Sequence, residues 1–154
     1  MFYISSREEE IESYEVIYMR RVGAYGESNR ILMEKFKSWL KEHDLYTAHN
    51  IIFAIPLDKP ITTEANKCRY DVCTIYPSDQ NTHIGEVTSK KIEGGKFIVF
   101  LIEHTAVAVE SAWDECFAEI KRIGYQLDES RPTMERYART LVEQHLCEIC
   151  VPIL

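Results

Sequence analysis

Glu135 and Tyr137 are the residues of this chain whose types and spacing fit a chemical role. They lie in Arg131-Pro-Thr-Met-Glu-Arg-Tyr137, shortly before the apolar closing segment at 146–153. Side chains two residues apart share one face of an extended strand, so the carboxylate and the ring can adjoin. A carboxylate drawn out of water beside aromatic faces attracts an organic cation, and its raised pKa also allows it to store a proton. The segment therefore predicts a cation receptor or a catalytic carboxylate.

The competing hypothesis places Glu135 at an exposed rim, in an ion pair with a neighbouring arginine. Three arginines are available for that pair: Arg131, Arg136 and Arg139. If the chain is an enzyme, Glu135 would attack the substrate or activate a water molecule, and Tyr25 or Tyr137 would donate a proton to the leaving carbon. No G-x-S-x-G motif and no phosphate-binding loop occurs in the sequence to supply another mechanism.

Further aromatic residues are candidates for the wall of a pocket. Tyr25 follows a predicted strand, where a strand-to-helix turn would lie at the edge of a cleft; the alternative is a surface tyrosine. Phe53 and Tyr70 lie on predicted strands and could be pocket wall or core. Trp113 and Phe117 are spaced to pack a helix on a sheet, although Trp113 lies near the helix start and could reach the cleft mouth.

The elements that must position these side chains follow the order strand, helix, strand, strand, and this order occurs twice. The first set comprises a strand at 13–22, a helix with apolar Leu32, Phe36, Trp39 and Leu40, and strands at 51–55 and 68–76. The second comprises a strand at 96–102, a helix with apolar Val109, Trp113, Cys116, Phe117 and Ile120 that ends at Gly124, and extended segments at 133–138 and 146–153.

This order predicts an α+β fold of two pseudo-duplicated units, with a largely antiparallel sheet, both helices on one face and a cleft between the units. We expect one domain at 13–154 with repeats at about 13–77 and 88–153, a linker at 78–85 and an N-terminal extension at 1–12. The continuously apolar strands need cover on both faces. Two helices cover one face, so folded-over strands, a partner subunit or a ligand groove must close the other.

Composition excludes several classes of function. The net charge is −7 and lysines and arginines form no basic stripe, so we expect no direct nucleic-acid binding. No apolar run approaches the ~20 residues of a membrane span. The start of the chain lacks the pattern of a signal peptide, and these features predict a cytoplasmic protein. Edge strands of such a sheet would allow a homodimer.

The five cysteines fit a reducing compartment better than a disulfide framework. Cys147 and Cys150 form a C-x-x-C, but it lies in an apolar, β-branched run. Residues three apart on a strand point to opposite faces, so the two thiols should diverge and act as small buried hydrophobes. The histidines are scattered along the chain. We therefore expect no metal and no cofactor.

Several short motifs, taken in order, resemble the GyrI-like small-molecule-binding family, which also supplies effector-binding domains to multidrug-responsive regulators of the AraC and MerR types. The resemblance runs from about Tyr14 to Ile153. It is carried by Val22-Gly-Ala-Tyr25, Pro56-Leu-Asp-Lys-Pro60, Arg69-Tyr-Asp-Val-Cys73, Gly94-Gly-Lys-Phe97, Gly124-Tyr125, Arg131-Pro132 with Glu135-Arg-Tyr137, and Glu148-Ile-Cys-Val-Pro-Ile153. The sequence departs from the family pattern at Gly23-Ala-Tyr25 and Glu103-His-Thr105, both at the rim of the cleft.

The resemblance implies a cleft in which Glu135, among aromatic rings, receives lipophilic cations. The leading hypothesis is a stand-alone binding domain for cationic or amphipathic compounds, without a helix-turn-helix of its own because little chain precedes residue 13. The first alternative, also implied by the family, is a glutamate-dependent hydrolase of strained, cyclopropane-bearing natural products. The second is a protein-interaction module that binds DNA gyrase.

Overall fold

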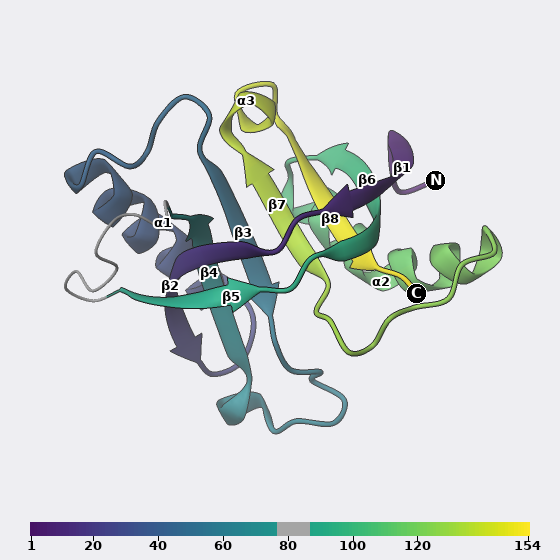
Figure 1. Cartoon of the computed structure of the whole chain (residues 1–154). Helices are drawn as coiled ribbons and strands as arrows, with labels where there is room; N and C mark the ends of the chain where they lie inside the picture. Colours follow the sequence, from purple (N-terminus) through teal and green to yellow (C-terminus); the bar gives the residue numbers. More distant parts are fainter. Residues whose placement is uncertain (77–86) are drawn as a thin grey trace.

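The computed structural model describes residues 1–76 and 87–154, so the predicted linker at 78–85 lies outside the described residues. Figure 1 shows the arrangement of the elements. The strands are β1 (Ser5–Ile11), β2 (Tyr14–Val22), β3 (Ile51–Pro56), β4 (Arg69–Ile75), β5 (Thr88–Ile92), β6 (Gly95–Glu103), β7 (Met134–Ala138) and β8 (Leu146–Pro152). The helices are α1 (Glu27–Glu42), α2 (Ala106–Arg122) and the short α3 (Arg139–Val142), with a 3-10 turn at Ala65–Lys67.

The described strands form one antiparallel sheet in the order β1-β6-β8-β7-β3-β4-β2-β5. This order is symmetric about the β7–β3 pair at its centre, because β2-α1-β3-β4 and β6-α2-β7-β8 occupy equivalent places on the two sides. The duplicated strand-helix-strand-strand unit is therefore confirmed, and so is the antiparallel α+β class. The last strands of the two units, β4 and β8, each have seven residues.

The two edge strands are exchanged between the repeats. β1 precedes the first repeat in the chain but pairs with β6 of the second, whereas β5 precedes the second repeat and pairs with β2 of the first. The segment 1–12, predicted to be an extension, thus contains an integral strand of the sheet. The acidic sequence of this segment did not predict a strand, because most of its side chains are exposed. Main-chain pairing with β6 holds the strand in place.

Buried carboxylates help to fix both exchanged strands. Asp71, the third residue of β4, pairs with Lys90 of β5. Glu148, the third residue of β8, accepts from Arg7 of β1 at 2.8 Å and from Arg136 of β7 at 2.9 Å. Because both carboxylates are almost fully buried, their pairing with cations is required to offset lost hydration.

Both helices cover the same face of the sheet, as predicted. α1 packs on a cluster from β2, β3 and β4, and α2 packs on a second cluster from β6 and β8, with Tyr137 contacting both clusters. The opposite face holds a third cluster to which all eight described strands contribute. Folded-over strands, a partner subunit and a ligand groove were the three predicted ways to cover this face. In the structure, the strands themselves cover it. Cys147 lies beneath α2 and Cys150 in the third cluster, so their thiols diverge as expected.

Candidate functional site

A cavity of about 1680 Å³ lies between the two helices, over the centre of the sheet. Its walls come from the first half of α1, one side of α2, and the loops at 56–61 and 127–133. Strand β7 supplies Glu135 and Tyr137 to its floor. The two repeats thus enclose the cavity together, because β7 pairs with β3 across their boundary.

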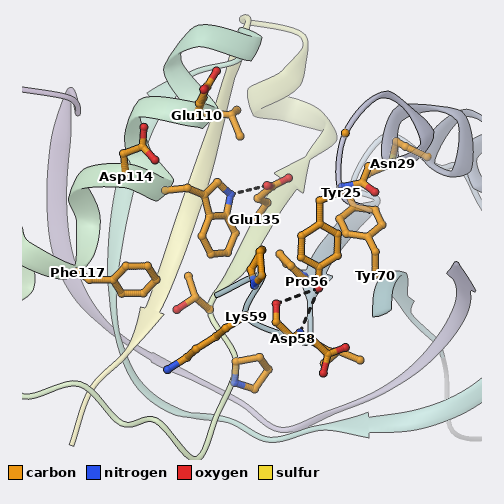
Figure 2. Close-up of a pocket in the computed structure, with 18 of the residues that line it drawn as sticks. Tyr25, Asn29, Pro56, Asp58, Lys59, Tyr70, Glu110, Asp114, Phe117 and Glu135 are labelled. Atoms are coloured by element: carbon orange, nitrogen blue, oxygen red, sulfur yellow. Dashed lines mark hydrogen bonds between the residues drawn. The ribbon is translucent and has the colours of Figure 1, made fainter. Parts of the chain in front are cut away.

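Glu135 is held in this cavity by two hydrogen-bond donors. Trp113 of α2 donates its indole N–H to Oε2 at 2.6 Å, which is the dashed line at Glu135 in Figure 2. Tyr137 donates its hydroxyl to Oε1 at 2.5 Å. The predicted neighbour Tyr137 therefore lies on the same face of β7. Trp113 comes from the second helix, so the contact also ties α2 to the centre of the sheet.

Among the described residues, no cation forms an ion pair with Glu135. Burial raises the pKa of the Glu135 carboxyl, and the hydrogen bonds from Tyr137 and Trp113 offset only part of that rise. Burial, followed by the negative charge of Glu135, likewise raises the pKa of the Tyr137 hydroxyl well above its ordinary value. The same two causes raise the pKa of Tyr70. Both phenols are therefore neutral proton donors at physiological pH.

The three arginines of the competing rim hypothesis all have other partners. Arg131 pairs with Asp128 at 2.8 Å. Arg136 points to the opposite face of the sheet, where it pairs with Glu9 and Glu148. Arg139 donates to the Tyr46 carbonyl at 2.6 Å. For Arg136, alternation along β7 explains the separation from Glu135, since adjacent residues of a strand face opposite ways.

Tyr25 and Tyr70 form the wall of the cavity on the side of the first repeat. Their ring centroids lie 6.2 Å apart, and Figure 2 shows both rings on the same side of Glu135. The Tyr25 hydroxyl donates to the Arg69 carbonyl at 2.7 Å and accepts from the Asp58 N–H at 3.1 Å. Because these bonds anchor the ring at the base of the 56–61 loop, Tyr25 is a fixed part of the wall.

Phe53 does not reach the cavity, contrary to the interpretation of Phe53 as pocket wall. In the β3–β7 ladder Ala54 lies opposite Glu135 and Phe53 opposite Arg136, so Phe53 faces the strand-closed cluster, where it is 1% exposed. A continuously apolar strand looks the same on both faces, so the sequence could not show which face Phe53 takes.

Phe117 and His104 are among the cavity residues that were not predicted as site residues. Phe117, interpreted as core, lines the cavity and is 36% exposed. His104 lines it next to Tyr137, with 5.2 Å between the ring centroids. Burial, and secondarily the charge of Lys37, lowers the pKa of His104, so this imidazole is neutral. Its position in Glu103-His-Thr105, where the sequence departs from the family pattern, was the available signal.

The described residues contain no group of three or more His, Cys, Asp or Glu side chains arranged to hold a metal ion. Within the same residues, no helix is long and apolar enough to cross a membrane. The centre of the cavity therefore offers the Glu135 carboxylate, its two hydrogen-bond donors and several aromatic faces, and exposed charged side chains such as Glu110 also belong to the lining. Such a set can bind a cation, or move a proton between Glu135 and a phenol.

Comparison with known proteins identifies the fold. The GyrI-like small molecule binding domain family matches residues 5–154. The chain belongs to the GyrI-like family. The match starts where β1 starts, in agreement with the strand's place in the sheet.

Two proteins with assigned names are similar to this chain in sequence. The chain is 38% identical over 147 residues to the "SPbeta prophage-derived putative transcriptional regulator YosT" of Bacillus subtilis (strain 168), covering 94% of this chain and 96% of that protein. It is 32% identical over 128 residues to the "DNA gyrase inhibitor" of Pectobacterium carotovorum subsp. carotovorum (strain PC1), covering 79% of each.

Solved structures share this GyrI-like fold at low sequence identity. The EcmrR C-terminal domain superposes with a TM-score of 0.71 at 14% identity, covering all of this chain and 99% of that domain. In the EcmrR–DNA complex the chain spans 57% of the longer EcmrR chain. SAV2435 bound to tetraphenylphosphonium gives a TM-score of 0.61 at 16% identity, covering 98% of this chain and 94% of the other.

Proposed function

We propose that this GyrI-like domain is a cytoplasmic effector-binding domain that takes lipophilic or amphipathic organic cations through Glu135. The observation that carries the proposal is the carboxylate itself, which is partly buried at the floor of a cavity, hydrogen-bonded by neutral donors and unpaired with any cation of the described residues. A buried charge without a counter-ion is costly. A cationic ligand would supply the missing charge.

The surrounding rings favour a lipophilic cation over a small hydrated one. Tyr25, Tyr70 and Trp113 all line the cavity, and each aromatic face attracts a cation by about 0.5–2 kcal/mol. A metal ion would keep its water shell or require several oxygen ligands. An organic cation with apolar groups around its charge can lose water at little cost and cover these rings.

The relatives support the proposal without deciding it. SAV2435, which has the same fold, has been solved with a lipophilic cation, tetraphenylphosphonium. YosT is described as a regulator of transcription, and the EcmrR domain is part of a DNA-binding protein. A role in which the bound cation acts as a signal for transcription agrees with both relatives. The chain would then act with a DNA-binding segment or partner.

One observation favours a second candidate, a glutamate-dependent hydrolase. The Tyr137 hydroxyl already donates to Glu135, so a carboxylate and a proton donor adjoin in one cavity. On a strained, cyclopropane-bearing substrate, Glu135 would attack a ring carbon or activate water, and the phenol would protonate the leaving carbon. A third candidate is an interaction with DNA gyrase, since the second relative is named a DNA gyrase inhibitor. The tests below also address this candidate.

The proposal predicts that tetraphenylphosphonium raises the melting temperature of the wild type. At a concentration 100-fold above its dissociation constant, a ligand adds about 2.7 kcal/mol to the free energy of unfolding. For a domain of this size that is a shift of roughly 5–10 °C. Glu135→Gln should abolish the shift, because it removes the buried charge and keeps the shape of the side chain.

The matched control is Glu110→Gln, which neutralises an exposed carboxylate on the cavity wall and should keep most of the shift. If no lipophilic cation shifts the wild type, the receptor function is wrong. Turnover of a strained electrophile by the wild type, lost in Glu135→Gln, would establish the hydrolase instead. Inhibition of gyrase supercoiling that survives Glu135→Gln would favour the interaction module.

A further inference from the structure

The cavity extends well beyond the immediate surroundings of Glu135. Its volume of about 1680 Å³ exceeds the ~300–1,000 Å³ that is usual for the site of one drug-sized ligand. In the view of Figure 2, Glu135 lies between Tyr25 and Tyr70 on one side and Phe117 on the other. We call the part of the cavity around Glu135, Tyr25 and Tyr70 the inner half, and the part lined by Phe117 and the loops at 56–61 and 127–133 the outer half.

Two exposed apolar side chains line this outer half. Phe117 of α2 is 36% exposed, and its ring centroid lies 6.3 Å from that of Trp113. Ile61, in the loop that follows β3, is 97% exposed. Both belong to the lining of the same cavity as Glu135. Apolar surface in water is unfavourable, and covering it with an apolar ligand group contributes to binding.

The loop that carries Ile61 is held in place at its base and at its turn. At the base, the Leu57 N–H donates to the Arg69 carbonyl at 3.0 Å. At the turn, the N–H groups of Thr62 and Thr63 donate to the Lys59 carbonyl at 3.0 and 2.9 Å. Ile61 thus lies within a hydrogen-bonded turn, which keeps it at the mouth of the cavity.

An ion pair joins the two loops that frame the outer half. Lys59 lies 3.6 Å from Glu129, and both side chains are largely exposed. Such a pair is weak in water. It places charges on the two loops, whereas Ile61 and Phe117 add exposed apolar surface to the lining of the same cavity. The outer half therefore suits an uncharged arm of a ligand better than a second charged group.

We propose that Phe117 and Ile61 form an outer apolar subsite that takes a hydrophobic arm of the cation whose charge lies at Glu135. This inference rests on the proposed function and narrows its ligand class. The preferred ligands are amphipathic cations with an alkyl or aryl arm long enough to pass from the carboxylate to the mouth. Compact cations fill the inner half alone and bind more weakly.

A homologous series tests the outer subsite. Methyl-, butyl- and hexyl-triphenylphosphonium share one charged head and differ in arm length. Calorimetric dissociation constants of the wild type should tighten along the series, by up to about fourfold for each fully buried methylene. In the double variant Ile61→Ser, Phe117→Ser, the increase in the logarithm of the affinity from the methyl to the hexyl compound should be less than half of the wild-type increase. The affinity for the methyl compound should stay within about threefold.

Val107→Ser is the matched control, because Val107 is 76% exposed on the same helix and does not line the cavity. It should reproduce the wild-type series. Ile61→Ser alone changes only an exposed loop residue, so it keeps the test valid if Phe117→Ser impairs folding. The subsite is overturned if the increase in affinity with arm length is unchanged in both the double variant and Ile61→Ser, or if the wild type binds all three compounds equally. Either result leaves the proposed function intact. Failure of all three to bind the wild type overturns both.

Discussion

At the scale of single residues, Glu135 is the position where folding and binding make opposite demands. Two hydrogen bonds from Trp113 and Tyr137 stabilise its carboxylate, but burial outweighs them and raises its pKa. Raising the pKa of an acid in the folded state means that its ionised form destabilises the fold. The domain thus carries an unfavourable charge, and a bound cation would relieve it.

This conflict predicts that cation affinity rises with pH. Tetraphenylphosphonium has no titratable group, so any pH dependence reports on the protein. Its affinity should fall about tenfold per pH unit below the pKa of Glu135, with a midpoint above the ordinary carboxyl value of 4.5. Titration calorimetry between pH 4 and 8 measures this.

The sign of the linkage can be checked on the unliganded protein. Since the folded pKa is raised, the stability contribution of Glu135 is complete below the unfolded pKa and is lost as pH rises through the folded one. Glu135→Gln should remove that loss, and no pH-dependent cation binding should remain in this variant over the same range. A wild-type affinity that does not change with pH would show that Glu135 carries no part of the binding.

The sequence predicted some of these residues for identifiable physical reasons. The spacing of two between Glu135 and Tyr137 fixes their common face on any strand, and the structure shows it. The sequence could not show which face of β3 Phe53 occupies. Both faces of β3 are buried, so its residues do not alternate between apolar and polar. Trp113 was placed at the cleft mouth only as an alternative, since its role depends on how α2 sits over β7.

At the scale of elements, the exchange of β1 and β5 depends on two short connections that cross each other. Residues 12–13 join β1 to β2, and residues 93–94 join β5 to β6. They touch at Gly94, whose N–H donates to the Ser13 hydroxyl at 2.9 Å. A Cβ at Gly94 would lie 2.6 Å from the Ser13 nitrogen and still closer to the Ile11 carbonyl oxygen. Only glycine fits at this crossing.

Gly94→Ala is therefore expected to destabilise the fold by about 2 kcal/mol or more, because backbone has to move to admit the methyl group. The melting temperature should drop by roughly 4–8 °C. Ser13→Ala is the control at the same crossing. It removes one exposed hydrogen bond and should cost about 1 kcal/mol or less. Equal stability of Gly94→Ala and the wild type in thermal and urea melts would refute the close crossing.

The sequence predicted the central elements well and the edge strands poorly. Helices α1 and α2 are predicted by apolar periodicity, and most of the six inner strands by runs of apolar, β-branched and aromatic residues, because burial requires such residues. β1 and β5 lack that pattern because each has one neighbour and few buried side chains. Their pairing comes from contacts between residues 70–96 positions apart, such as Ser5 with Leu101, which no local pattern encodes.

At the scale of the whole molecule, the two repeats form one cooperative unit. The third cluster draws on all eight described strands, so neither repeat can bury it alone. Each repeat also lends an edge strand to the other, held by the pairs of Lys90 with Asp71 and Arg7 with Glu148. The cavity needs both repeats as well, since its charge comes from β7 and two of its rings from the first repeat.

This interdependence predicts a single unfolding transition, and the chain has one tryptophan in each repeat to test it. Trp39 lies on α1 and Trp113 on α2. In the variants Trp39→Phe and Trp113→Phe, fluorescence reports one repeat at a time, while far-ultraviolet circular dichroism reports both. Within each variant the two urea midpoints should coincide, because separating the repeats would expose the shared cluster and break both exchanged strands. A fluorescence midpoint that precedes the dichroism midpoint in one variant would mean that this repeat unfolds first, so the exchanged strands would not couple the two halves.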